Sequence, residues 1–313
     1  MLDTPVVLVA FRRPGVTRMV LEAIREAGAR QFFIIADGPR QGNLAEEKLV
    51  YETRQILSTL DWECRVTRIY SDENLGLRER VLTGLDKVFS SVDRAIILED
   101  DCLPHQDFFQ FASELLERFE NTNEVALISA NNFAPNSKMA DSYYFATHAN
   151  IWGWATWRRT WQEFRSEPPP MPLGTELRKV IKSRLPGLFR SRGFLRLTDL
   201  AGKLDSWAIQ FAASCHLKNK LVVVPKVNLA RNIGFGQDST HTKFESYADE
   251  VDTQPLGFPL THPINVAASF PEMKRESRIK SLRWIIFPIM HPLNFLKRLW
   301  RYAKVLMSAA LRK

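Results

Sequence analysis

Short apolar runs alternate with longer segments of helical periodicity over residues 6–128, and this alternation restricts the fold more than any other feature. The apolar runs predict strands at 6–11, 32–36, 66–70, 95–98 and 125–128. Between them, apolar residues recur every three or four positions and predict helices near 19–27, 49–60, 77–89 and 108–119. Strands that alternate with helices form βαβ units, so we expect an α/β fold with a mainly parallel sheet sandwiched by helices.

The regular alternation stops after about residue 140. The remaining segments are a tryptophan-rich stretch, a proline run that predicts a rigid connector, a basic helical segment, a helix, a strand and a polar glycine-containing loop, at 151–161, 168–172, 177–196, 206–217, 221–224 and 228–243. Trp152, Trp154, Trp157 and Trp161 include pairs three and four residues apart, which favours a helix-and-turn seam packed against the sheet.

Positive charge is concentrated at the C-terminus. The chain carries 43 Lys and Arg against 35 Asp and Glu, a net charge of +8, and nine of those bases and none of the acids lie in 277–313. There the bases interleave with Trp, Phe, Ile and Leu, a mixture that favours an anionic membrane surface over nucleic acid. A basic helix docked on the protein's own body is the alternative. Pro288 and Pro292 interrupt any apolar run long enough to span a bilayer.

Cysteine usage and the N-terminus both indicate a reducing, cytoplasmic location. Cys64, Cys102 and Cys215 are an odd number without a CxxC pair, so neither a disulfide framework nor a zinc knuckle is expected. The apolar run near the N-terminus is too short for a signal peptide. We expect Cys102 to be a buried structural thiol, and Cys215 and His216 to have no functional role.

Polar residues directly follow each of the first four predicted strands. They are Arg12-Arg13-Pro14, Asp37-Gly38-Pro39, the run Ser-Asp-Glu-Asn-Leu-Gly at 71–76, and Glu99-Asp100-Asp101. Ligands of open parallel sheets bind at the carboxyl ends of the strands, so these residues should line a site. The glycine-rich phosphate loops of dinucleotide and P-loop proteins are absent from the sequence. The acidic triplet could instead hold Mg²⁺ or Mn²⁺ on an exposed strand end, or it could be a surface turn.

Five segments together resemble a known family. They are 7–13, Asp37-Gly38-Pro39, Asn74-Leu75-Gly76, 97–102 and the run Ile-Trp-Gly-Trp-Ala-Thr-Trp at 151–157. They are similar to those of bacterial nucleotide-diphospho-sugar transferases with the GT-A fold, family-2-like glycosyltransferases of which some are labelled haemolytic proteins. The acidic triplet and Arg13 also resemble eukaryotic N-acetylglucosaminyltransferase I. The resemblance covers roughly residues 5–245 and leaves out the C-terminal tail.

The resemblance implies specific roles near the nucleotide. Asp37 would read the uracil imide, Arg13 would lie near the nucleotide or its phosphates, and Asp100 would contact the ribose. Asp101 would bind the metal directly as the last residue of a DxD-like motif. Glu99 fits least well because that motif usually begins with Asp. Arg78 would contact the base or a phosphate, or else it is an exposed arginine in the first turn of a helix.

Two further residues would act on the acceptor side. Asp205 stands where inverting GT-A enzymes have their general base, and it could equally be the N-cap of the helix that follows. His241, in a glycine-containing loop, resembles the late histidine that closes over the metal, although a lone loop histidine is usually just solvated. One ring of the tryptophan-rich stretch would line the acceptor site.

We therefore expect one GT-A domain and a tail. Residues 1–140 would form the nucleotide-sugar-binding half, 141–270 the acceptor-binding and catalytic half, and 271–313 a basic amphipathic tail on the inner face of the cell membrane. The expected activity is inverting, Mn²⁺- or Mg²⁺-dependent transfer of a sugar from a UDP-sugar to a surface glycan or lipid-linked acceptor. A sugar-phosphate nucleotidyltransferase fits less well because no glycine-rich loop follows the first strand. A non-catalytic, haemolysin-like membrane protein with a decayed transferase domain is the other alternative.

Overall fold

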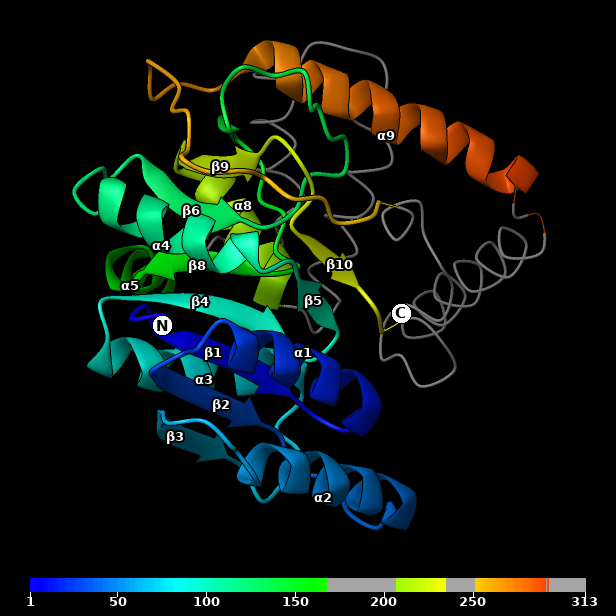
Figure 1. Cartoon of the computed structure of the whole chain (residues 1–313). Coiled ribbons are helices and arrows are strands. Elements are labelled where there is room, and N and C mark those ends of the chain that lie inside the picture. The colour runs from blue at the N-terminus through cyan, green and yellow to red at the C-terminus, as the bar shows by residue number, and fades with distance from the viewer. Residues whose placement is uncertain (168–206, 235–250, 291, 293–313) are drawn as a thin grey trace.

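One large sheet organises the chain in the computed structural model, which describes residues 1–167, 207–234, 251–290 and 292 (Figure 1). Within these residues the strand order is β3-β2-β1-β4-β8-β6-β9-β7. Six strands run in one direction, whereas β8 and β7 are antiparallel to their neighbours. The bounds are β1 Val6–Ala10, β2 Gln31–Ala36, β3 Arg65–Tyr70, β4 Arg94–Glu99, β6 Val125–Ser129, β7 Tyr143–Ala146, β8 Trp154–Trp157 and β9 Leu221–Pro225.

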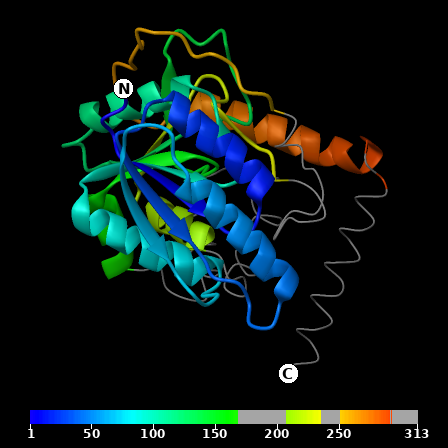
Figure 2. The ribbon, with the colours of Figure 1, turned by 60° about the horizontal axis from the view of Figure 1, so that its bottom comes forward.

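Helices cover both faces of this sheet, as Figures 1 and 2 show. Helices α1, α2 and α4 contribute buried side chains to the core on one face, and α3, α5 and α8 to the core on the other. Their bounds are α1 Pro14–Glu26, α2 Leu44–Ser58, α3 Leu77–Ser91, α4 Asp107–Arg118, α5 Arg158–Ser166 and α8 Trp207–Leu217. The predicted α/β class, a mainly parallel Rossmann-like sheet sandwiched by helices, is confirmed.

Strand β1 illustrates why the apolar runs form central strands. All five of its residues are buried; Val6 and Leu8 face the core that contains α1, while Val7 and Val9 face the core that contains α3. Side chains alternate between the two faces of a strand, so a strand that is covered on both sides needs apolar residues at every position. The continuous run at 6–10 therefore specifies a central strand.

The tryptophan-rich stretch differs from the helix-and-turn seam that its spacing predicted. Trp154–Trp157 form strand β8, which is inserted between β4 and β6, and α5 begins only at Arg158. Residues three apart in a strand lie on opposite faces, so Trp154 packs in the core of α3 and Trp157 in the core of α4. Trp161 lies on α5 and is also buried. The expected packing role of these three rings is confirmed, although they do not form one helical seam.

A small antiparallel pair lies beside the main sheet. Strand β5 (Cys102–Pro104) pairs with β10 (Ala230–Asn232). The loop expected over 228–243 is therefore partly a strand, because three of its residues pair with β5, which directly follows the acidic triplet. The pairing continues with a hydrogen bond of 2.7 Å from the Ile233 N–H to the Asp101 carbonyl.

Helix α9 (Phe270–Met290) has a docked half and a projecting half. In its docked half, Met273 and Glu276 are buried, and the Glu276 carboxylate lies 2.7 Å from His148 Nε2 and accepts a hydrogen bond from the Tyr144 hydroxyl. The Arg275 guanidinium donates to backbone carbonyls of the 134–135 loop. Figures 1 and 2 both show the other half extending past the rest of the described chain. The first turns of the segment expected as a tail thus pack against the body.

Candidate functional site

The carboxyl ends of β1, β2, β3 and β4 lie side by side at one edge of the sheet (Figure 1). Parallel pairing in register causes this, because β1 hydrogen-bonds to both β2 and β4, and β2 to β3. Arg13, Asp37, the loop 71–76 and the acidic triplet are therefore brought to one edge, as the sequence predicted from their positions after successive strands.

Arg13 forms a bridge across two residues of the acidic triplet. Its guanidinium donates to an Asp100 oxygen through Nη2 and to Asp101 Oδ2 through Nη1, the latter at 2.8 Å. The second Asp100 oxygen accepts from the Phe11 N–H at 3.1 Å. Asp100 and Asp101 are 2% and 7% exposed, so the expectation of a carboxylate on an exposed strand end is wrong for Asp101. The segment around Gly234 crosses the carboxyl end of β4 and covers Asp101.

Gly234 packs directly on this ion pair. A Cβ at position 234 would collide with the Asp101 side chain and with Arg13 Nη1. The close approach follows from the β5–β10 pairing, which draws the chain across the end of β4. Nothing in the sequence around residue 234 indicated this contact, because it depends on a pairing between segments more than a hundred residues apart.

Burial and mutual repulsion raise the pKa values of Glu99 and Asp100. The pKa of Glu99 rises to about 8, because the side chain is desolvated and lies near the charges of Asp101 and Asp100. The pKa of Asp100 rises to about 6 through burial, although Arg13 opposes the rise. Desolvation would lower the pKa of Arg13, but the two carboxylates outweigh it and raise that pKa. Cys102, next in the chain, is fully buried as expected, and burial raises the pKa of its thiol.

Asp37 at the end of β2 holds a loop of its own chain. Its carboxylate accepts hydrogen bonds from the N–H groups of Gly38, Leu75 and Gly76 and from the Asn74 amide, at 2.9–3.1 Å. A carboxylate has about four acceptor positions, so an incoming uracil N–H would have to replace one of these donors. Burial raises the pKa of Asp37, and the backbone hydrogen bonds oppose that rise.

The ends of β2 and β3 are further joined by close contacts. The Arg54 guanidinium of α2 donates to the carbonyls of both Asp37 and Ser71. A Cβ on Gly38 would lie 2.5 Å from the Asp72 carbonyl oxygen, so only glycine allows the two loops to approach this closely. The Asp37 loop and the Asn74 loop are therefore joined into one continuous rim of the candidate site.

Arg80 is a candidate that the sequence analysis missed. It lies in the first turn of α3 and is 5% exposed, and its Nε atom has no hydrogen-bond partner among the residues that the structure describes. Burial lowers its pKa, and the nearby Asp37 carboxylate opposes this effect. Arg78, for which the sequence left open either a contact with the base or a phosphate or an exposed position, is exposed on the same turn. The difference follows from the helical turn, which places neighbouring arginines in different directions, and one sequence alone does not reveal it.

Two of the acceptor-side candidates, Asp205 and His241, lie outside the described residues, whereas the tryptophan-rich stretch lies within them. Helix α8 begins at Trp207, whose ring stacks on Trp154 with centroids 5.5 Å apart; Trp154 in turn pairs with Ile97, two residues before the triplet. Trp152 is half-buried against Phe133, with ring centroids 5.3 Å apart. Among the four tryptophans it is the only one that is not buried.

The donor set at the triplet suits a hard divalent cation. Mg²⁺ is commonly held by one or two carboxylates together with substrate phosphates. Glu99 and Asp101 supply carboxylates, and the Glu99 side chain forms no hydrogen bond or ion pair with any residue in the described part of the chain. Residues 1–167, 207–234 and 251–290 contain no group of three or more His, Cys, Asp or Glu able to hold a metal by themselves. The remaining ligands would therefore have to come from the bound substrate.

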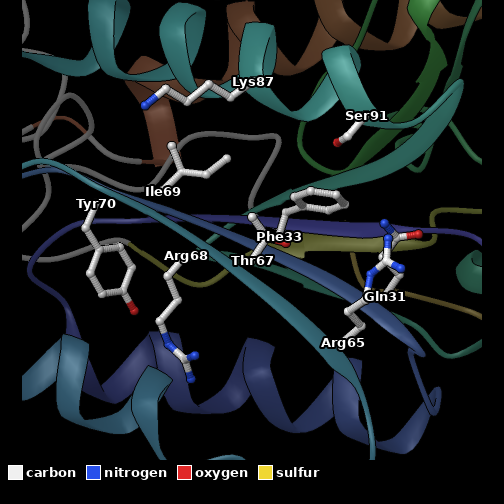
Figure 3. A pocket seen from close by; sticks show the side chains of 9 residues that line it. All are labelled: Gln31, Phe33, Arg65, Thr67, Arg68, Ile69, Tyr70, Lys87 and Ser91. Carbon is white, nitrogen blue, oxygen red and sulfur yellow. The ribbon is translucent and has the colours of Figure 1, made fainter.

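A separate hollow of about 410 Å³ lies at the β3 edge of the sheet. Figure 3 shows its lining side chains, which come from β2, β3 and α3 and include Arg65, Arg68 and Lys87. None of the predicted site residues lines it. We therefore build the candidate site on the carboxyl ends of the strands and not on this hollow.

No protein-family model and no curated protein sequence matches this chain. Solved structures that are similar to this chain include a UDP-glucose pyrophosphorylase complexed with UDP-glucose (TM-score 0.39, 11% identity, covering 72% of this chain and 90% of that chain). Another is a mannosyltransferase from Pyrobaculum calidifontis in complex with GDP-Man and Mn²⁺ (TM-score 0.34, 13% identity, 69% and 76%). Both TM-scores are below 0.5, so neither similarity carries an argument about function.

Proposed function

We propose that this protein is a metal-dependent glycosyltransferase. It would transfer a sugar from a nucleoside-diphosphate donor, a UDP-sugar, to a glycan or lipid-linked acceptor with inversion of the anomeric carbon. The observation that carries the proposal is the buried bridge of Arg13 with Asp100 and Asp101 at the carboxyl edge of the sheet. An arginine and adjacent carboxylates at that edge suit a diphosphate and the cation that accompanies it.

The described residues divide the work of binding the donor. Asp101 and Glu99 would hold Mn²⁺ or Mg²⁺, Asp100 would accept from the ribose hydroxyls, and Arg13 would contact the diphosphate. Asp37, Arg78 and the buried Arg80 would surround the base at the rim made by the two joined loops. His241, outside the described residues, would contribute to the metal site. Residues 1–140 would thus form the donor-binding half of the domain.

The chemistry requires charge stabilisation and one proton acceptor. A bound divalent cation would offset the negative charge that develops on the leaving diphosphate. Asp205 would accept the proton of the attacking hydroxyl on the side opposite the leaving group, so that a single displacement inverts the anomeric carbon. Residues 141–270 would form this acceptor-binding half, and Trp152 is the ring best placed by its partial exposure to lie against a sugar.

A panel of nucleotides and nucleotide sugars with and without Mn²⁺ tests the proposal by thermal unfolding. UDP and UDP-sugars should raise the melting temperature only with Mn²⁺, because the cation is needed for tight binding and a ligand of the native state stabilises it by RT ln(1 + [L]/Kd). Slow release of UDP from the stabilising UDP-sugar would support a transferase. Formation of UTP after addition of pyrophosphate would instead identify a nucleotidyltransferase. No stabilisation by any nucleotide would contradict the proposal.

The projecting half of α9 supports attachment to an anionic membrane surface. Leu282, Ile286 and Ile289 are 57%, 39% and 76% exposed, and their spacing of four and three residues places them on one helical stripe. The segment 277–313 adds nine basic residues and no acid. Within the described part of the chain, no helix has the length and apolar character needed to cross a bilayer. The stripe would therefore insert at the interface while the bases contact lipid headgroups.

Changing Leu282, Ile286 and Ile289 to Gln should release the protein from anionic vesicles. Three exposed apolar side chains that would insert into the membrane interface are lost, each contributing on the order of 1 kcal/mol or more to binding, so the bound fraction should fall at least tenfold. Sedimentation with vesicles that contain phosphatidylserine measures this effect. The matched control changes the exposed Leu44 and Tyr51 of α2 to Gln, which removes apolar surface elsewhere. Equal sedimentation of the wild type and the triple variant would contradict the membrane role.

A further inference from the structure

The Arg13 guanidinium already contacts the carboxylates that a cation bound to the acidic triplet would also have to contact. Arg13 Nη1 lies 2.8 Å from Asp101 Oδ2, and Nη2 donates to Asp100. The other oxygens of these two carboxylates are also in contact, Asp100 with the Phe11 N–H and Asp101 with the Cys102 thiol. The described protein thus neutralises much of the charge of its own triplet without any external cation.

A divalent cation and this arginine cannot share Asp101 Oδ2 without strong repulsion. A metal–oxygen distance of about 2.1 Å together with the nitrogen–oxygen distance of the ion pair would bring the two cations to within about 5 Å of each other. The surroundings are largely buried, since Asp101 is 7% exposed and the Arg13 side chain 18%, so water would screen this repulsion only weakly. Either the arginine moves or the metal binds weakly.

We propose that Arg13 and a divalent cation compete for Asp100 and Asp101, so that the Arg13 bridge opposes metal binding until an anionic ligand draws the guanidinium away. Gly234 leaves no side chain between Arg13 and Asp101, which allows the bridge to form. Arg13 is also the N-cap residue of α1 and makes no side-chain cap of its own, so its guanidinium is not tied to the helix start.

The identity of the anion rests on the proposed function, whereas the competition itself does not. If the ligand is a nucleoside diphosphate, its phosphates would accept from the guanidinium in place of the carboxylates. Metal and nucleotide would then bind cooperatively, because the nucleotide removes the competitor of the metal. Mn²⁺ alone would bind the wild-type protein weakly.

Replacing Arg13 by Met tests the competition with Mn²⁺ alone. We expect the Arg13→Met variant to bind Mn²⁺ at least about tenfold more tightly than the wild type, because a positive charge is removed from the metal's surroundings. Titration followed by the electron paramagnetic resonance signal of free Mn²⁺ measures this without nucleotide or turnover. Arg12→Met is the matched control: it removes the same charge one residue away, where Glu46 retains Arg40 as a partner at 2.6 Å.

The stability of the variant gives a second readout. Without Arg13 the two buried carboxylates repel each other, so Arg13→Met should unfold at a lower temperature, and Mn²⁺ should raise its melting temperature more than that of the wild type. Equal Mn²⁺ affinity in Arg13→Met and wild type, or no Mn²⁺ binding by either, would overturn the proposal. A separate titration of the protein with UDP at fixed Mn²⁺ measures nucleotide binding. If UDP does not bind while Arg13→Met still binds Mn²⁺ more tightly than the wild type, the proposed function is contradicted and the competition between Arg13 and the metal is supported.

Discussion

Replacing Asp101 by Asn should abolish Mn²⁺-dependent binding of UDP, with a loss of at least about a hundredfold in affinity. Asn keeps the size of the side chain but removes the anionic oxygen that a hard cation requires. The variant should also lose about 2 kcal/mol of its free energy of unfolding, because Arg13 gives up one charged hydrogen-bond partner at a buried position. Isothermal titration with UDP and Mn²⁺ measures the first effect, and urea unfolding measures the second.

Asp93→Asn is the matched control for this prediction. Asp93 lies just before β4, at the opposite end of that strand from the triplet; its side chain is 81% exposed and paired with Arg158. Removing this carboxylate changes the net charge by the same amount, yet it should alter neither UDP affinity nor, by more than about 0.5 kcal/mol, stability. Unchanged Mn²⁺-dependent UDP binding in Asp101→Asn would show that the triplet is not the metal site.

Replacing Asp205 by Asn should lower turnover by about 10² to 10⁴ while donor and metal binding persist. The carboxamide cannot accept the proton of the attacking hydroxyl, and removal of a general base has an effect of this size. Initial-rate measurements at saturating donor give the loss of turnover, and thermal shift with UDP and Mn²⁺ reports binding. Nuclear magnetic resonance of the first product should show the anomeric configuration inverted relative to the donor.

Asp205→Ser separates the proposed base from a helix cap. Serine is a good N-cap residue but a poor base at neutral pH, so this variant should remain stable and still lose turnover. Full turnover in Asp205→Ser, or a product with retained configuration, would move the catalytic role to another residue. Asp205 would then be a cap for α8, the helix that contains the buried Trp207.

The sequence predicted most of the sheet because the signal there is local. The apolar run predicted as a strand at 32–36 forms β2, which begins one residue earlier at Gln31, and the helix predicted near 77–89 is α3 at Leu77–Ser91. A strand covered on both faces must be apolar throughout, and a helix that packs on a sheet must repeat its apolar residues at helical spacing. Both constraints act between near neighbours in the chain, so they can be seen without the tertiary structure.

The same approach failed for Trp154–Trp157, where the local pattern fits two structures. Tryptophans three apart suit a helix face, but they also suit a strand with a core on each side, and that is the structure they adopt. The choice depends on the open hydrogen-bonding groups of β4 and β6, between which β8 is inserted. Those strands are distant in sequence, so the tryptophan run alone did not determine its own conformation.

The candidate site divides in the same way. Their positions after successive strands were enough to predict that Arg13, Asp37 and the acidic triplet gather at one edge, because parallel strands bring their carboxyl ends together. The partners of these side chains became visible in the folded chain alone: Arg13 bridges Asp100 and Asp101, and Asp37 holds the Asn74 loop. The same is true of the burial of Asp101 beneath Gly234 and of the burial of Arg80. Local apolar patterns specify the strand and helix order, whereas an ion pair or a buried charge depends on side chains that meet after distant segments have packed.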